Sequence, residues 1–336
     1  MKRLVVDTSN ILFRVASAHG KYNSGGTAED QAGLAMHMSL NTLKSHYRKV
    51  KPDQVAVAFE GAKNWRKDYT KSTDCVSKRY YKGNRVTDES KVAFYELIAA
   101  FEQLARQHTS LVCLSHPRLE GDDVIAGYTQ HFSAIGDEVV ILSGDKDFIQ
   151  LLKLPGVSLL NPDDGKLRGW DKETGEKIDP EYFMFEKAIR GDAGDNVLAA
   201  YPRVRVTKIQ QAFTDEFAKA NLMNSTWEFA DPDTGAKRTM KVGDLFKENM
   251  TLMNLFEQPP EIRALLDETI RHEIVHHGQF SLFHFQKFCA KFALKKISED
   301  AQHFMELFSS TGRNSPEKEA TKAIAAEKKR TNTLVF

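Results

Sequence analysis

Short apolar runs rich in β-branched residues alternate with segments of helical periodicity over the first two-thirds of the chain. The apolar runs predict four strands, at residues 3–6, 54–59, 110–114 and 138–142. Apolar positions spaced three and four residues apart predict helices at residues 34–48, 91–106 and 124–132. This alternation is typical of an α/β fold, in which a mostly parallel sheet is flanked by helices.

Acidic residues follow each of the four predicted strands. In chain order, and grouped by strand, they are Asp7; Glu60; Glu120, Asp122 and Asp123; and Asp145 and Asp147. In open α/β sheets, ligands bind in the crevice beyond the carboxyl ends of the strands. We therefore expect these acids to meet at one edge of the sheet.

Each acid taken alone has an ordinary structural explanation. Asp122, Asp123, Asp145 and Asp147 lie near predicted helix starts, where a carboxylate caps free N–H groups and meets the positive end of the helix dipole. Capping does not explain two or three acids in one turn, nor Glu60, which precedes a glycine and a basic loop. Oxygen ligands without His or Cys favour Mg²⁺, with Mn²⁺ as an alternative. So many acids suggest two ions, about 4 Å apart, as in enzymes that cleave phosphodiester bonds.

Composition adds few restrictions. The 336 residues, 41% of them hydrophobic, suffice for one large domain or two modest ones. The net charge of +1 neither favours nor excludes a polyanionic partner. Cys75, Cys113 and Cys289 match no zinc spacing and predict reduced thiols in a cytosolic protein. The N-terminus shows no signal-like apolar run, and no later run is long enough to span a bilayer, so we expect a cytoplasmic protein that neither is exported nor enters a membrane.

A further acidic segment leads to a family resemblance. The segment IRGDAGDNV adds Asp192 and Asp195 where the sheet pattern ends. Together with LEGDDVIA and LSGDKDFIQLL it resembles the three acidic signatures of the 5′ nuclease (flap endonuclease) superfamily, and VVDTSNILFR resembles the first strand of that family. The segments WEFADPDTGAKRTMKV and KENMTLMNLF extend the resemblance, to the phage 5′→3′ exonucleases of the T-even RNase H group, as far as about Phe308. The resemblance implies a PIN-like nuclease core.

The resemblance also implies a role for each acid. Direct ligands of a first ion would be Glu120, Asp122 and Asp145, with Asp7 and Glu60 acting mainly through water. Ligands of a second ion would be Asp147 and Asp192, with Asp123 and Asp195 nearby. Glu60 stands where the family more often has Asp, which favours an outer-sphere role. One ion would lower the pKa of a bound water, and both would stabilise the scissile phosphate.

A basic segment, KNWRKDYTKSTDCVSKRYYKGNR at residues 63–85, supplies positive charge and aromatic rings. A solvated surface loop is the ordinary explanation, but interleaved aromatic residues favour binding to unpaired bases and their phosphates. In the family the segment resembles the helical arch over single-stranded 5′ ends, here residues 61–95. Lys82 and Arg85 are then expected at the scissile phosphate as catalytic residues, and Tyr81 on a base. The other expected nucleic-acid contacts are Lys63, Arg66, Lys67, Lys78 and Arg79.

The chain departs from most of the superfamily after the last acidic signature. Where a glycine-rich helix-hairpin-helix is usual, LAAYPRVRVTKIQQAF contains no glycine, which puts the K⁺ site of the family in doubt. Arg203, Arg205 and Lys208 are expected to hold duplex phosphates instead. The pattern predicts a nuclease core at residues 1–200, a smaller helical duplex-binding domain at 201–308 with a β-hairpin turning at DPDTG, and a flexible tail at 309–336.

Two other functions compete with a nuclease. His272, Glu273 and His276 form HExxH, a zinc-peptidase pattern that is short enough to arise by chance and would leave the acids unexplained. A DNA-binding protein without catalysis is disfavoured because every expected acid is present.

The resemblance implies a Mg²⁺-dependent 5′→3′ exonuclease and flap endonuclease that removes RNA primers or 5′ flaps in phage-type replication, in the host cytoplasm if the chain is phage-encoded. The expected substrates are DNA and RNA–DNA duplexes with 5′ ends or flaps, and the expected enzyme is a monomer that works beside a single-strand-binding protein. The terminal residues Leu334, Val335 and Phe336 either fray or dock on a sliding clamp.

Overall fold

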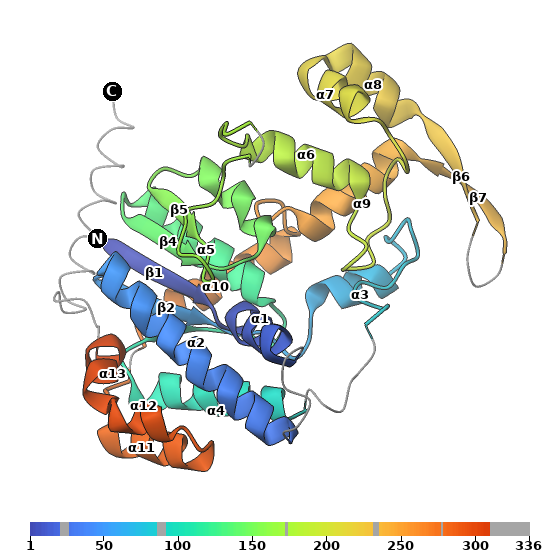
Figure 1. Ribbon diagram of the computed structural model, residues 1–336. Coiled ribbons are helices and arrows are strands. Elements are labelled where there is room, and N and C mark those ends of the chain that lie inside the picture. The colour runs from blue at the N-terminus through green and yellow to red at the C-terminus, as the bar shows by residue number, and fades with distance from the viewer. Residues whose placement is uncertain (21–26, 86–91, 172–173, 231–234, 277, 310–336) are drawn as a thin grey trace.

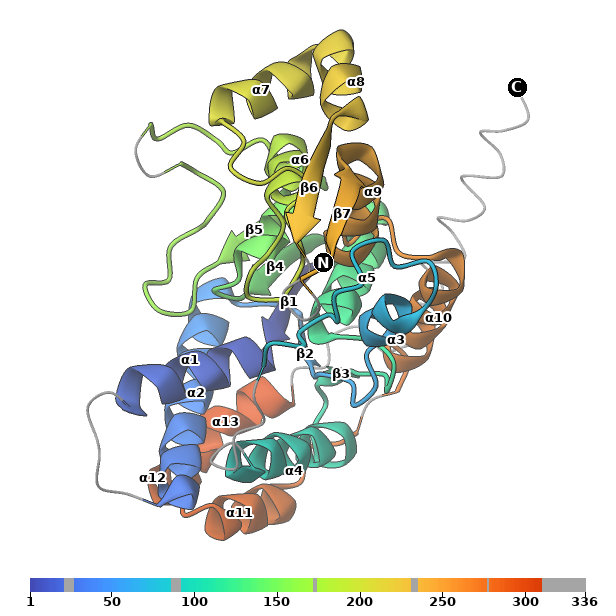
Figure 2. The same cartoon turned by 90° about the vertical axis from the view of Figure 1, so that its right-hand side faces the viewer.

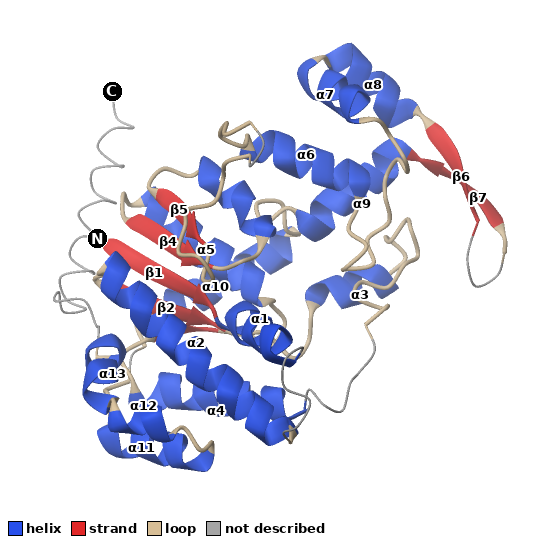
Figure 3. Ribbon diagram, in the orientation of Figure 1, coloured by secondary structure: helices blue, strands red, loops and turns tan. Residues whose placement is uncertain are grey.

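The computed structural model describes residues 1–20, 27–85, 92–171, 174–230, 235–276 and 278–309, and a parallel five-stranded sheet lies at its centre (Figures 1 and 3). The strands are β1 (Lys2–Asp7), β2 (Gln54–Ala58), β3 (Val112–Leu114), β4 (Glu138–Leu142) and β5 (Val157–Leu160), in the order β3-β2-β1-β4-β5. The four strands predicted from the sequence are confirmed, and β5 is an addition.

Both faces of the sheet are buried, as its continuous apolar strands require. Leu4 and Val6 of β1 point into one core, with α1 (Thr8–Gly20), α2 (Ala28–Val50) and α4 (Val92–His108). Val5 points into the other core, with α5 (Gly121–Ala134) and the 3₁₀ helix η2 (Lys146–Lys153). The predicted helices correspond to α2, α4 and α5, so the expected α/β fold is confirmed.

A second lobe stands above the sheet (Figure 2) and has a core of its own. Its elements are α6 (Pro180–Arg190), α7 (Val206–Thr214), α8 (Glu216–Asn224), β6 (Thr226–Ala230), β7 (Lys237–Lys241) and α9 (Val242–Met253). The antiparallel pairing of β6 and β7 confirms the predicted hairpin, although most of its turn, residues 231–234, lies outside the described residues.

The expected helical domain at 201–308 is wrong as a packing unit. The helix α10 (Pro260–Glu273) returns to the sheet, where Ile262, Leu266 and Ile270 join the core around α5. The helices α11 (Leu282–Lys291), α12 (Lys295–Glu299) and α13 (Ala301–Phe308) complete the opposite core beside α2 and α4. Helical periodicity identifies an apolar face but not the surface that covers it. The tail at 310–336 lies outside the described residues.

The basic segment contains one short helix, α3 (Trp65–Lys71), followed by turns as far as Arg85. Residues 86–91 of the expected arch lie outside the described residues, and residues 92–95 already belong to α4. None of the helices in the described ranges is long and apolar enough to cross a membrane.

Candidate active site

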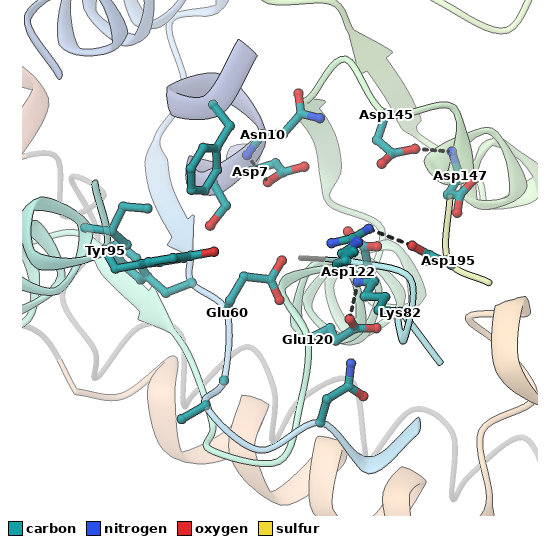
Figure 4. Close-up of a pocket in the computed structure, with 18 of the residues that line it drawn as sticks. Asp7, Asn10, Glu60, Lys82, Tyr95, Glu120, Asp122, Asp145, Asp147 and Asp195 are labelled. Carbon is teal, nitrogen blue, oxygen red and sulfur yellow. Dashed lines mark hydrogen bonds and ion pairs between the residues drawn. The ribbon is translucent and has the colours of Figure 1, made fainter. Parts of the chain in front are cut away.

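A pocket of about 920 Å³ lies beyond the carboxyl ends of the strands (Figure 4). Eight of the nine acids singled out in the sequence line it, namely Asp7, Glu60, Glu120, Asp122, Asp145, Asp147, Asp192 and Asp195. They come from the ends of β1, β2 and β4, from the start of α5 and from the loop after α6. The structure therefore brings together acids that are far apart in the sequence.

Local hydrogen bonds fix the acids that follow β1 and β4. Asp7 accepts hydrogen bonds from the backbone N–H of Asn10 at 3.0 Å and from the hydroxyl of Ser143 at 2.8 Å. Asp145 accepts one from the backbone N–H of Asp147 at 2.9 Å and so caps η2. Capping and a place in the pocket are thus compatible for Asp145, because its second carboxylate oxygen is not needed for the cap.

The pocket raises the pKa of several carboxyl groups. Burial raises the pKa of Asp7 to about 6. Glu60 has an exposed side chain at the mouth of the pocket and accepts a hydrogen bond from the N–H of Gly121 at 3.1 Å. Desolvation by the surrounding protein, and then the charge of Glu120, raise the pKa of Glu60 to about 7. Desolvation and four neighbouring acids raise the pKa of Asp122 well above its ordinary value. A cation in this pocket would therefore compete with protons.

Asp123 does not face the pocket, which corrects its expected place near the second ion. It is fully buried, and its two oxygens accept hydrogen bonds from the Arg66 guanidinium at 2.7 and 2.8 Å. The indole N–H of Trp65 and the backbone N–H of Glu120 also donate to it. Burial alone would raise the pKa of Asp123, but Arg66 holds it below its usual value. Arg66 is 2% exposed, so its expected contact with nucleic acid is also wrong.

Tyr81 and Lys82 are neighbours in the chain but lie in different environments, since only Lys82 lines the pocket. Tyr81 is 5% exposed and donates its hydroxyl toward Asp195 at 2.7 Å and Glu120 at 3.1 Å, so it is not available to stack on a base. Lys82 has a left-handed backbone, with φ of 55°, and its ammonium pairs with Glu120. Arg85 is exposed and pairs with Asp195 at 2.7 Å.

Lys187 is a further basic residue of the site, on α6, that the sequence did not single out. Its ammonium pairs with Asp147 and, at 3.1 Å, with Asp192. Within the described residues, no three acidic, His or Cys side chains converge closely enough to hold an ion in this arrangement. Lys82 and Lys187 instead lie between the acids, where they offset the negative charge.

The far wall of the pocket is formed by α1 and α4, and its residues were also missed. The guanidinium of Arg14 lies against the backbone of Gly144, where a Cβ atom would approach it to 2.5 Å, and pairs with Asp163. The rings of Phe13 and Tyr95 meet edge to face at 5.9 Å, and both line the pocket. Phe13 and Arg14 lie in VVDTSNILFR, whose family resemblance was a signal in the sequence, whereas no motif pointed to Tyr95.

Comparison with known proteins identifies the family. The model of the 5′-3′ exonuclease N-terminal resolvase-like domain matches residues 2–187, more than half of the 336 residues. The chain belongs to the 5′-3′ exonuclease family. It is 28% identical to the ribonuclease H of Enterobacteria phage T4 over 180 residues, which are 51% of this chain and 55% of that protein. It is 30% identical to the exodeoxyribonuclease of Enterobacteria phage T3 over 143 residues, which are 42% of this chain and 41% of that protein. The chain thus spans about half the length of these curated relatives.

Solved structures show the same fold. The bacteriophage T5 D15 protein, co-crystallised with metal ions, has a TM-score of 0.56 at 18% identity, over 82% of this chain and 98% of that chain. A complex of the T5 D15 flap endonuclease with DNA and metal ions has a TM-score of 0.54 at 17% identity, over the same shares of 82% and 98%. At these identities the likeness concerns the fold alone.

The other basic residues that were expected to contact nucleic acid in this exonuclease-family chain fall into two groups. Near the pocket, Lys63, Lys67 and Lys78 are exposed, whereas the half-buried Arg79 lies over the ring of Phe229 at 5.5 Å. On the second lobe, the exposed residues are Arg203, Arg205 and Lys208. Lys78 also donates to the carbonyl of Thr73 at 3.1 Å, and the ammonium of Lys208 lies over the ring of Tyr201 at 4.7 Å.

The structure does not support a zinc site at HExxH. The helix α10 ends at Glu273, so His276 lies beyond it, and the ring of His276 stacks on that of His272 at 4.1 Å. Glu273 is buried and pairs with Arg106 at 2.6 Å, which removes it from the role of a general base. The pattern is therefore a helix end whose buried glutamate is paired with Arg106 of α4.

Proposed function

We propose that this protein is a Mg²⁺-dependent 5′→3′ exonuclease and structure-specific flap endonuclease that hydrolyses phosphodiester bonds. Its substrates would be DNA and RNA–DNA duplexes with 5′ ends or flaps, so it would remove RNA primers or flaps during replication. The observation that carries the proposal is the pocket lined by eight predicted acids, with Lys82 and Arg85 at its rim. Membership of the 5′-3′ exonuclease family supports the same chemistry.

The donor set fits divalent cations, because the acids around the pocket offer hard carboxylate oxygens and none of the described residues that line it is His or Cys. Glu120, Asp122 and Asp145 would hold a first ion, with Asp7 and Glu60 around it. Asp147, Asp192 and Asp195 would hold a second ion. Such ions supply a nucleophilic water at neutral pH and offset the charge on the phosphate. Lys82 and Lys187 have to release their carboxylates before ions can be held there.

The chain's own cations would bind and orient the substrate. Lys82 and Arg85 can exchange their carboxylate partners for the oxygens of the scissile phosphate, because both side chains line the pocket. Arg14 can do the same from the opposite wall. Phe13 and Tyr95 offer aromatic surface to the adjoining nucleotide.

Lys67, which lines the pocket, and Lys63, Lys78 and Arg79 outside it would follow the single strand. The exposed residues Arg203, Arg205 and Lys208 would contact duplex phosphates.

End-labelled flap, nicked and RNA-primed duplexes test this function directly. With Mg²⁺ we expect short products released from the 5′ end, and with EDTA none. Cleavage that persists in EDTA, or no cleavage of any of the three substrates with Mg²⁺ or Mn²⁺, would contradict the proposal. Binding of the flap without cleavage would instead favour a DNA-binding protein without catalysis.

We also propose that Leu334, Val335 and Phe336 dock on a sliding clamp, since a terminal anchor raises the local concentration of enzyme at primer junctions. Removing residues 331–336 should leave cleavage of free oligonucleotides unchanged and abolish binding to the cognate clamp. Equal clamp binding by full-length and shortened protein would reject this docking.

A further inference from the structure

The segment KENMTLMNLF, residues 247–256, links the basic segment to α6 without lining the pocket. Its Leu252 and Met253 share a small apolar cluster with Tyr81 and with Met184 of α6. The carbonyl of Leu252 accepts a hydrogen bond from Nε of Arg66 at 2.6 Å. The second half of α9 is therefore in contact with both sides of the candidate active site.

Glu248, within this segment, holds the backbone of the basic segment. Its carboxylate is 2% exposed and accepts hydrogen bonds from the backbone N–H of Val76 and, at 3.2 and 3.3 Å, from that of Ser77. A buried carboxylate is costly unless it is hydrogen-bonded, so burial strengthens its hold on these two N–H groups. The anchored turn lies a few residues before Lys82.

Asn249, the next residue, holds the opposite side of the site. It is fully buried, and its side-chain NH₂ donates to the carbonyls of Ala188 and Leu198, both at 2.8 Å. Those carbonyls flank the loop that carries Asp192 and Asp195. One turn of α9 thus binds the backbone on both sides of the pocket.

The two anchored segments also meet each other. The N–H of Lys82 donates to the carbonyl of Asp195 at 2.8 Å, and the side chain of Asn196 donates to the carbonyl of Tyr80 at 2.9 Å. Lys82 and Asn196 both have left-handed backbones, with φ of 55° and 57°; asparagine adopts this conformation readily, but a lysine keeps it only when its surroundings enforce it.

We propose that Glu248 and Asn249 are positioning residues, which set the place of Lys82 relative to the acids of the 192–195 loop. Neither touches the pocket, so they would act on cleavage only through the backbone segments that they hold. A displacement of about 1 Å in a catalytic group can lower a rate by about a hundredfold. The inference rests on the proposed nuclease function for its effect on cleavage, but not for the anchoring itself.

Thiol accessibility tests the anchoring without any assay of activity. Cys75, Cys113 and Cys289 are all buried, but only Cys75 lies beside the turn held by Glu248. In Glu248→Ala we expect iodoacetamide to label Cys75 about tenfold faster or more, since two hydrogen bonds to a charged group are lost. Labelling of Cys113 and Cys289, identified by peptide mass mapping, should stay slow, because their core is intact.

Two variants make this test robust. Glu248→Gln keeps one acceptor oxygen and should expose Cys75 less than Glu248→Ala, so it serves if the alanine variant does not fold. Asp244→Asn removes one negative charge from the exposed side of the same helix and should leave Cys75 protected. Unchanged Cys75 labelling in both Glu248 variants, or equal exposure of all three thiols, would overturn the proposal. The second result would mean that Glu248 is needed for the whole fold and not for this turn.

Single-turnover cleavage of a flap substrate gives the functional readout. We expect Glu248→Ala to lower the cleavage rate by about tenfold to a hundredfold and to change the Kd for the flap by much less, since the DNA-binding cations remain. Asn249→Ala should leave Cys75 protected and weaken Mn²⁺ binding measured by calorimetry, because the loop of Asp192 and Asp195 is released. A rate within twofold of wild type despite an exposed Cys75 would refute positioning. An inactive wild type would reject the nuclease function, and the thiol result would still decide the anchoring.

Discussion

Arg66 lies within the basic segment of the sequence, but in the structure it is the partner of a buried carboxylate. Replacing it with Met keeps much of the apolar stem and removes the guanidinium. Asp123, which is fully buried, would then lose its two hydrogen bonds of 2.7 and 2.8 Å, and the carbonyl of Leu252 would lose a donor at 2.6 Å. The pairing of Arg66 with Glu120 at 2.9 Å would also be lost.

The size of the effect follows from the charge that remains. Removing one partner of a buried ion pair costs about 3–5 kcal/mol, because the other charge stays buried without compensation. We therefore expect Arg66→Met to lower the free energy of unfolding by about 3–5 kcal/mol, a large part of the roughly 5–15 kcal/mol that stabilises typical proteins. If Arg66 were instead an exposed residue that binds phosphate, replacing it would change the free energy of unfolding by no more than about 0.5 kcal/mol.

Urea unfolding of the protein in EDTA measures this difference, with circular dichroism and tryptophan fluorescence as probes; Trp65, which contributes to that fluorescence, donates to Asp123. Lys67→Met is the matched control, since Lys67 is the exposed neighbour of Arg66 on α3 and should leave stability nearly unchanged. Adding Asp123→Asn to Arg66→Met should restore part of the loss, because a neutral amide can still accept from Trp65. A loss below about 1 kcal/mol, or a further loss on adding Asp123→Asn, would refute the buried-pair account.

Three further predictions concern the pocket. Asp145→Asn should abolish Mg²⁺-dependent cleavage and leave flap binding intact or tighter, because a ligand charge is lost and no DNA contact; normal turnover would reject the metal assignment. Lys187→Met should strengthen Mn²⁺ binding by about tenfold in calorimetry. The Lys187 ammonium pairs with Asp147 and Asp192, and its removal leaves both carboxylates free to bind the ion. Unchanged Mn²⁺ affinity would show that Lys187 does not compete with the ion. The pKa of Glu60 is raised to about 7 and that of Asp7 to about 6, so both carboxyl groups bind protons as the pH falls through these values. Mn²⁺ affinity should therefore fall steadily from pH 8 to pH 6. An affinity that does not change with pH would contradict the raised pKa values.

The sequence predicted those parts of the fold and site that follow from local pattern and chain order. Short apolar runs identified four of the five strands of the sheet, including the three-residue β3, whereas the run of β5 is interrupted by Ser158. The meeting of acids at one edge followed from parallel strands, because their carboxyl ends share that edge. The surfaces on which α10 to α13 pack could not be predicted, because the pattern of an amphipathic helix shows its apolar face but not the surface that this face covers.

Roles that depend on burial were the least predictable. Arg66 and Tyr81 have the same sequence surroundings as their exposed neighbours, yet both are buried against acids. Asp123 has the same side chain as Asp122, one position earlier, but only Asp122 lines the pocket. The capping explanation holds for Asp123, which accepts a hydrogen bond from the backbone N–H of Glu120. Lys187 is a single lysine on an amphipathic helix, and only the fold places its ammonium between Asp147 and Asp192.

The pocket as a whole explains why cations from distant parts of the chain are needed. Its lining carries ten acidic and four basic side chains, a formal charge of −6 if every acid is ionised. Like charges at this range repel, and the fold reduces that repulsion in two ways: raised pKa values keep part of the acids protonated, and ammonium groups bridge others. Protonation and ammonium pairing are both reversible, because a divalent cation can displace protons and lysine ammonium groups from the carboxylates. An acid cluster that is stabilised by exchangeable partners can fold before it binds metal or DNA, whereas one neutralised by buried arginines, as Asp123 is, has no such freedom. Asp123 is therefore a structural group, whereas Asp122, without such a partner, is the one expected to bind the cation of the proposed function.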